Sequence, residues 1–151
     1  MVKITSLELM IFMKESSVLI KEKIKYIVIH CSDTDPNDTA EDIHKLHVSF
    51  KWDGIGYHKI ITKNGKIENG RPEFWKGAHV YGYNHISLGI CLIGKQNFTK
   101  LQMKSLEKLI LTWKKKYLHA KVVGHYSLTK SNKTCPNFDV EKWYKTIENR
   151  K

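Results

Sequence analysis

The sequence predicts an α/β fold: a single domain with a mixed β-sheet flanked by helices. At 151 residues the chain has the length of one domain. Its 41% hydrophobic and 27% charged residues are typical of a globular protein that buries a core. Strand-like runs alternate along the chain with segments of helical spacing, and one hairpin signal interrupts them.

Three strands and one helix are expected in the first half of the chain. Runs of β-branched and aromatic residues predict the strands. Thr39 and Asp42 have the spacing of a capping box that begins a helix. Asn64 and Gly65 form a dipeptide that is typical of a hairpin turn. The expected elements are a strand at 26–30, a helix from 40 to about 51, a strand at 57–62 and its hairpin partner at 66–68.

The second half begins with a long surface loop, residues 70–84, which holds three glycines and four aromatic residues without any period. Thr99 and Gln102 form a second capping box before a long helix. Asp139 is expected to cap the last helix. The other expected elements are a strand at 87–93, the long helix to about 117, a strand at 121–124 and a loop at 125–136.

Two units are expected along the chain: an N-terminal extension of unassigned role, residues 1–25, and the folded domain, residues 26–151. Residues 7–13 come nearest to a signal core, but Glu8 interrupts them and no small-residue cleavage site follows. We therefore expect synthesis in the cytoplasm without a clear signal peptide. No apolar run approaches the roughly 20 residues of a membrane span, so none is expected.

The chain is strongly basic, with 26 Lys and Arg against 15 Asp and Glu and a formal charge of +11. This excess favours an anionic partner: nucleic acid, an acidic membrane surface or an anionic wall polymer. Arg71 and Arg150 are the only arginines. Because guanidinium groups dominate specific base recognition, nucleic acid is not the expected partner.

Three residues at strand ends and in one loop could share a metal ion. His30 ends a predicted strand, His125 follows another, and Cys135 ends the loop that His125 begins. Two imidazoles and one thiolate are the donors of a zinc site that keeps one position open for water, which is the catalytic pattern. This placement is compatible with a zinc site at one rim of the sheet, but single histidines are more often structural, so the spacing alone leaves both readings open.

The remaining cysteines and several histidines are expected to be structural. Three cysteines are too few for a disulfide framework and indicate a reducing compartment. Neighbouring strand residues point to opposite faces, so Cys31 should face the core if His30 faces a cleft. Cys91 is expected to be buried in its strand. His44 and His47 could share a metal on one helix face, but solvated or half-buried side chains are expected there.

Four ordered motifs resemble one protein family. They are YIVIHCS at 26–32, GYH at 56–58, GYNHISLGI at 82–90, and GH at 124–125 with KTCP at 133–136. Together they resemble the zinc-dependent N-acetylmuramoyl-L-alanine amidases of type 2, kin to peptidoglycan recognition proteins, and above all phage amidase endolysins. The resemblance covers residues 26–144 and implies that residues 26–151 are a zinc amidase domain.

The resemblance also implies roles for particular residues. Zn²⁺ would be held by His30, His125 and Cys135, with Tyr57 and Lys133 as catalytic residues. His79 matches a histidine that lines the substrate cleft. The aromatic residues of the 70–84 loop could stack on sugar or peptide, or could anchor the loop. The expected substrate-binding residues are His79, Trp75, Tyr83 and Asn84. The loop from His125 to Cys135 is two residues longer than in phage amidases.

The implied activity is hydrolysis of the bond between the lactyl group of N-acetylmuramic acid and L-alanine in peptidoglycan. A monomer is expected to act on the cell wall or its fragments. Lys133 would stabilise the oxyanion, and Tyr57 would orient water or act as general acid or base. The alternative is a non-catalytic peptidoglycan-binding module of the same fold. The sequence leaves open whether the protein is an endolysin, a wall-recycling enzyme or an enzyme delivered by another route.

Overall fold

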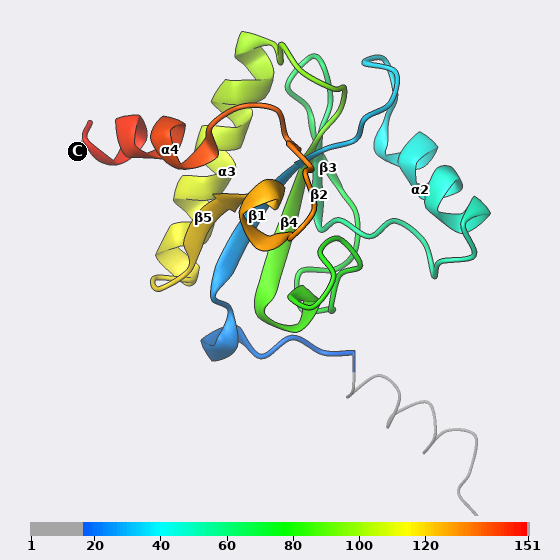
Figure 1. Cartoon of the computed structure of the whole chain (residues 1–151), viewed down its shortest axis with the longest axis horizontal. Helices are drawn as coiled ribbons and strands as arrows, with labels where there is room; N and C mark the ends of the chain where they lie inside the picture. Colours follow the sequence, from blue (N-terminus) through cyan, green and yellow to red (C-terminus); the bar gives the residue numbers. More distant parts are fainter. Residues whose placement is uncertain (1–16, 151) are drawn as a thin grey trace, which may run out of the picture.

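The computed structural model describes residues 17–150, which form a five-stranded sheet with helices on both faces (Figure 1). The strand order is β3-β2-β4-β1-β5. β1 pairs in parallel with β4 and β5, β2 pairs in parallel with β4, and β3 is antiparallel to β2. The mixed sheet predicted from the sequence is thus confirmed. The strands are β1 Tyr26–Cys31, β2 Lys59–Ile61, β3 Ile67–Asn69, β4 Ser87–Leu92 and β5 Lys121–Gly124.

The helices begin at the capping signals read from the sequence. Asp42 accepts the backbone N–H of Thr39 at 2.8 Å, and Gln102 accepts that of Thr99 at 3.0 Å. Asp139 accepts from the backbone N–H of Lys142. The α-helices are α2 Ala40–Ser49, α3 Lys100–Lys116 and α4 Val140–Glu148, and the short 3₁₀ helices are η1 Lys21–Lys23, η2 Asn84–Ile86 and η3 His125–Leu128.

Two predicted elements are shorter than expected. α2 ends at Ser49 rather than near residue 51, and β2 covers only Lys59–Ile61 of the expected 57–62. The hairpin that follows is present. Its loop has three residues, and Gly65 adopts a φ of +84°, a left-handed conformation that glycine adopts without steric cost.

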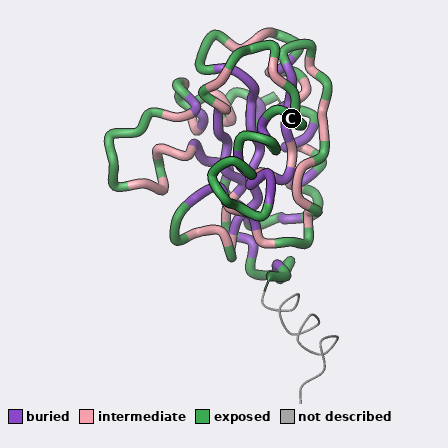
Figure 2. The backbone as a smooth tube through the Cα atoms, turned by 90° about the vertical axis from the view of Figure 1, so that its right-hand side faces the viewer, coloured by how far each residue is buried: buried purple, intermediate pink, exposed green. Residues whose placement is uncertain are grey.

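The sheet has one closed face and one partly open face. Ile27 and Ile29 of β1 point into the main core beneath α3 and α4. On the other face, α2 covers β2 and β4 through Ile43. Val28, on that same face of β1, packs beneath Val80 of the long loop. Figure 2 shows the buried strands at the centre and mostly exposed connecting segments around them. The face beside α2 is therefore where side chains of β1 can reach a cavity.

The part of the N-terminal segment that the structure describes packs on this body. Leu19 and Ile24 are buried in the main core. The backbone N–H of Leu19 donates to the carbonyl of Phe74, so residues 17–25 brace the long loop. The rest of the predicted extension, residues 1–16 with the stretch 7–13, lies outside the described residues.

A half-buried carboxylate ties the long loop to the end of α3. Glu73 accepts hydrogen bonds from Trp113 Nε1, Lys116 Nζ and Tyr117 OH at 3.2, 2.8 and 2.5 Å. Burial by itself would raise the pKa of Glu73. The bonds from Lys116 and Tyr117, and the charge of Lys116, outweigh it and hold that pKa below its ordinary value.

Among the described residues, no helix is both long and apolar enough to cross a membrane.

Candidate metal centre and its pocket

Three side chains of types that can bind a metal converge near the ends of β1 and β5. The parallel register pairs Ile29 with Gly124, so the next residues, His30 and His125, stand level at the same edge of the sheet. Their rings lie 4.6 Å apart between centroids. Cys135 completes the group, and its sulfur and one nitrogen of each ring all lie within 4.8 Å of one another. These are the three residues that the sequence predicted, and their arrangement could hold a metal ion.

A relay of hydrogen bonds determines which nitrogen of His30 carries the proton. Burial lowers the pKa of both His30 and His79 well below the ordinary value, and neighbouring imidazoles lower it further. Each ring is therefore neutral at pH 7 and has a single N–H. Ser87 Oγ donates to the carbonyl of Tyr83 at 2.7 Å, so it can only accept from His79 Nε2, 3.2 Å away.

The rest of the relay follows from that first bond. With the proton of His79 on Nε2, its Nδ1 must accept, and the partner 2.8 Å away is Nε2 of His30. His30 therefore has its proton on Nε2, and its Nδ1 keeps a free lone pair. Hydrogen bonds of this kind fix the tautomer and orientation of metal-binding histidines. The relay prepares His30 to bind a metal through Nδ1.

Two glycines leave room for the ring of His79. A Cβ at Gly89 in β4 would lie 2.7 Å from His79 Cγ, and one at Gly77 would lie 2.6 Å from His79 Cδ2. Both distances are shorter than carbon atoms tolerate, so a side chain at either position would displace the ring. Asn84 Oδ1 accepts the backbone N–H groups of His79 and Val80, each at 2.9 Å, and holds this part of the loop in place.

The structure confirms that Cys31 is buried and adds a neighbour that the sequence did not predict. Cys31 is one of the buried core residues, and its Sγ lies 3.5 Å from Cys135 Sγ. Its backbone N–H donates to the same sulfur at 3.1 Å. The reason is that β5 ends at Gly124, so Cys135 takes up the side of β1 that a further residue of β5 would cover. Strand alternation did not anticipate this because it ignores what lies beyond the last paired residue.

The three donors open onto a large hollow of about 1090 Å³. One wall comes from the segment before β2 and carries Trp52 and Tyr57, and the opposite wall is the segment after β5 with Lys130 and Lys133. Burial and then the charge of Lys133 lower the pKa of His125, which favours the neutral imidazole that a metal requires.

Tyr57 lies beside the metal group, with its ring centroid 5.0 Å from that of His30. Burial raises the pKa of its phenol well above the ordinary value, and the nearby thiols of Cys91, Cys135 and Cys31 raise it further. The phenol therefore keeps its proton at neutral pH. Tyr57 can donate a hydrogen bond or a proton into the hollow, whereas service as a base in the free protein is disfavoured.

The residues predicted to contact substrate differ in their placement. Tyr83, Asn84 and His79 line the hollow. Both ring nitrogens of His79 form hydrogen bonds, with His30 and with Ser87. Asn84 Oδ1 accepts hydrogen bonds from the backbone of the loop. Trp75 does not line the hollow; it pairs with Val18 and its carbonyl accepts from His58, which favours the alternative that it anchors the loop.

Sequence reasoning missed two residues of this site. Ser87 was read only as the start of a strand, and nothing in the spacing identified it as the end of the relay. Trp52, half exposed on the wall of the hollow, contacts His47 with ring centroids 4.6 Å apart. The available signal was an aromatic residue in the glycine-bearing turn between a helix and a strand.

Three other histidines form hydrogen bonds with the backbone. Nδ1 of His47 accepts the N–H of Gly56, and Nδ1 of His44 accepts that of Ile55, so the pair does not form a metal site. His47 is buried rather than solvated. His58 accepts from Gly89 and donates to Trp75, and burial lowers its pKa to about 4. These bonds fix the turn that carries Tyr57.

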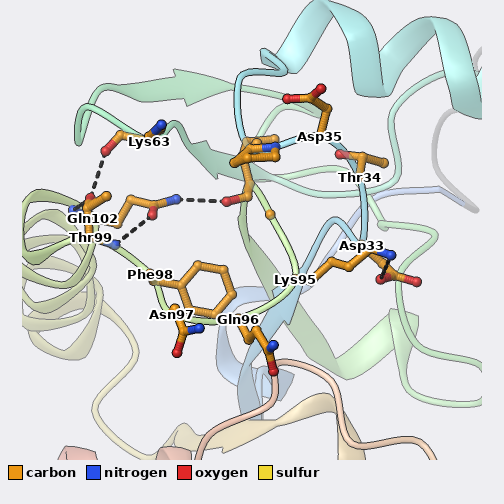
Figure 3. A pocket seen from close by; sticks show the side chains of 13 residues that line it. Asp33, Thr34, Asp35, Lys63, Lys95, Gln96, Asn97, Phe98, Thr99 and Gln102 are labelled. Carbon is orange, nitrogen blue, oxygen red and sulfur yellow. Dashed lines mark hydrogen bonds and ion pairs between the residues drawn. The ribbon is translucent and has the colours of Figure 1, made fainter.

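A second hollow, about 560 Å³, lies between the segments after β1 and after β4 (Figure 3). Several of its polar side chains are bonded to other parts of the fold. Gln102 donates to the carbonyls of Ile61 and Ile93, and Lys95 pairs with Asp33 at 3.7 Å. Among the described residues the His30 group is the only cluster suited to a metal.

Comparison with known proteins identifies relatives with the same overall length and fold. The family described as N-acetylmuramoyl-L-alanine amidase matches residues 20–138. The endolysin of Escherichia phage T7 is 37% identical over 138 residues, which are 85% of this chain and 90% of that protein.

Two solved structures show the same architecture. The N-acetylmuramoyl-L-alanine amidase LysC from Clostridium intestinale superimposes with a TM-score of 0.74 and 32% identity over 86% of each chain. A Drosophila PGRP-LB variant in complex with tracheal cytotoxin gives a TM-score of 0.70 and 26% identity, covering 82% of this chain and 80% of that one. These findings confirm the resemblance drawn from the four motifs.

Proposed function

The chain belongs to the N-acetylmuramoyl-L-alanine amidase family, and from that premise we propose that it is a zinc-dependent amidase. Its substrate is peptidoglycan, in which it hydrolyses the bond between the lactyl group of N-acetylmuramic acid and L-alanine. One observation carries the zinc dependence: donors of His30, His125 and Cys135 lie within 4.8 Å of one another at the floor of a large open hollow.

The donor set suits zinc. Zinc prefers nitrogen and sulfur ligands, and three protein ligands with one open position are typical of its catalytic sites. His30 and His125 have lowered pKa values and are neutral, as ligands must be. The neighbouring Cys31 thiol and burial raise the pKa of Cys135 above its ordinary value, and the backbone N–H of Cys31 offsets this only in part. Cys135 would therefore give up its proton on binding the metal. A zinc ion here would supply an acidified water as nucleophile and would polarise the scissile carbonyl.

The surrounding residues would carry the charge and protons of the reaction. Lys133 is a free-standing cation on the wall of the hollow, suited to stabilising the negative charge that develops on the carbonyl oxygen. Tyr57 retains its proton and would donate to the attacking water or to the departing amine. The relay through His79 to Ser87 would keep His30 oriented during turnover.

We extend the proposal to the protein as a whole. Residues 26–151 form the zinc amidase domain, to which residues 17–25 add a brace. All proposed ligands and catalytic residues come from one chain, which supports action as a monomer. Since relatives that match most of the chain are named endolysins, we assign it the same role, with the cell wall as its site of action.

Product analysis tests the proposal. Purified peptidoglycan should acquire new L-alanine amino termini without new reducing sugar ends, and metal measured on the same sample should be zinc in about one equivalent per chain. Chelation should abolish the activity and zinc should restore it. Binding to the wall without new amino termini would indicate a non-catalytic binding module, and binding to polyanions that collapses with salt would indicate a nucleic-acid-binding protein.

A further inference from the structure

Two thiols lie side by side at the edge of the metal group. Cys31 Sγ and Cys135 Sγ are 3.5 Å apart although 104 positions separate the residues in the sequence. A disulfide requires about 2.05 Å between sulfurs, so a relative movement of roughly 1.5 Å would join them. Both residues line the large hollow, where Cys135 is half-buried and Cys31 is buried. The proposed mechanism uses only the thiol of Cys135.

Local contacts hold the pair in this position. The backbone N–H of Cys31 donates to Cys135 Sγ at 3.1 Å, which fixes that sulfur against the end of β1. On the other side, Asn137 Nδ2 lies 3.8 Å from Cys31 Sγ. The backbone N–H of Tyr126 donates to the carbonyl of Cys135 at 3.1 Å. Both sulfurs therefore face one another as a consequence of the fold around them.

We propose that Cys31 and Cys135 are a site of reversible oxidation, at which a peroxide converts the metal-free dithiol into a disulfide. The cross-link removes the sulfur donor from the metal group. The part of this proposal that concerns metal rests on the proposed function, whereas formation of the disulfide does not.

The chemistry proceeds in two balanced steps. One of the two thiolates attacks one oxygen of the peroxide, the O–O bond breaks, and the second oxygen leaves with a proton as water or alcohol. The other thiolate then attacks the sulfur of the resulting sulfenic acid, and hydroxide leaves and takes up a proton. Each sulfur gives up one electron, the peroxide gains two, and an external dithiol reverses the product by exchange.

A bound metal should oppose this reaction. The sulfur electrons that attack the peroxide are those that a metal ion would bind, so the loaded protein must first release its metal. At a zinc concentration 100 times the dissociation constant, the metal-free fraction falls roughly 100-fold, and cross-linking should slow by about the same factor.

The third cysteine provides an internal control. Cys91 is fully buried in β4, among Ile43, Ile55 and Ile60. Its Sγ lies 3.7 Å from the carbonyl oxygen of Leu92 and also contacts the Tyr57 side chain. It should stay reduced under conditions that oxidise the other two thiols, because no peroxide can reach it without unfolding.

The experiment uses the full chain, either stripped with a chelator or loaded with zinc, and treats it with limited hydrogen peroxide. The readouts are intact mass, free-thiol count, peptide mapping and metal content. The stripped protein should lose two hydrogens, retain Cys91 as its free thiol, and yield a peptide cross-linked between Cys31 and Cys135. A dithiol reductant should restore both thiols and zinc binding.

Matched variants identify the thiols involved. Cys91→Ser should behave as the wild type, whereas Cys31→Ser should form no intramolecular disulfide and should instead oxidise further at Cys135. Persistence of both thiols in the stripped wild type, or a cross-link to Cys91, would overturn the proposal. Equal rates of cross-linking with and without zinc would leave the disulfide standing and would argue against zinc at Cys135, and hence against the proposed function.

Discussion

Replacing Ser87 with alanine tests the relay that orients His30. The side chain lies on the first residue of β4, away from the hollow, and its Oγ is the sole acceptor shown for His79 Nε2. The substitution removes one oxygen and touches neither the ligands nor the proposed catalytic residues. A change in metal affinity would therefore have to pass through His79.

The size of the effect follows from two ways in which His79 can respond. If its proton stays on Nε2, a buried donor is left without a partner, at a cost of about 1–3 kcal/mol. If the proton moves to Nδ1, that nitrogen donates to His30 Nε2, and the proton of His30 is forced onto the Nδ1 that should bind the metal. To bind the metal, both rings must return their protons to Nε2, which leaves His79 Nε2 without an acceptor. The binding free energy for the metal therefore weakens by up to about 1–3 kcal/mol, or roughly 5- to 150-fold in affinity.

The measurement is a zinc competition titration against a chromophoric chelator at neutral pH. Ser105→Ala is the matched control, because its Oγ also donates to a backbone carbonyl, that of Gly65, on the α3 side of the sheet. Nitrogen NMR of the metal-free Ser87→Ala variant should show the proton of His30 on Nδ1. If the proton of His79 stays on Nε2, the variant should instead lose about 1–3 kcal/mol of unfolding free energy. Zinc affinity, His30 tautomer and free energy of unfolding all equal to those of the wild type would refute the reasoning.

Three further perturbations test other parts of the site and fold. Cys135→Ala should lose zinc and activity together, and a fully metallated, active variant would remove Cys135 from the ligands. Lys133→Ala should keep its zinc and lower kcat by about 10²–10³, as removal of an oxyanion donor does. Lys130→Ala, on the same wall of the hollow, is the control and should change kcat little. Equal effects of the two substitutions would assign Lys133 only a general electrostatic role. Glu73→Gln should lower the free energy of unfolding by about 1–3 kcal/mol at neutral pH. The pKa of Glu73 is lower in the folded than in the unfolded protein, so its contribution to the free energy of unfolding is present above the unfolded pKa and is lost as pH falls through the folded pKa. Denaturation curves of the wild type and the variant should therefore converge in acid. A difference in stability that stays constant with pH would contradict this.

The sequence was sufficient to predict that His30, His125 and Cys135 lie together, through their placement at strand ends and the family resemblance. Parallel pairing explains the position of the two histidines. His30 and His125 each come directly after the last residues that β1 and β5 pair, and parallel strands end at a common edge. The position of Cys31 was beyond that reasoning. Alternation describes a strand between two neighbours, whereas Cys31 lies past the end of β5, where a loop closes over β1.

The relay from His30 through His79 to Ser87 could not be predicted from the sequence for a different reason. It also suggests why the family motifs contain the residues that surround His79. His79 lies in a loop without period, so no spacing relates it to His30. The glycines around it supply the missing information, since side chains at Gly77 and Gly89 would occupy the space of its ring. These two glycines, together with Ser87 and Asn84, are needed to seat His79 against His30. The residues around His79 in the 70–84 loop therefore serve to orient His30, the proposed metal ligand, at least as clearly as they serve to contact substrate. The first property to measure in a variant of this loop is its affinity for the metal.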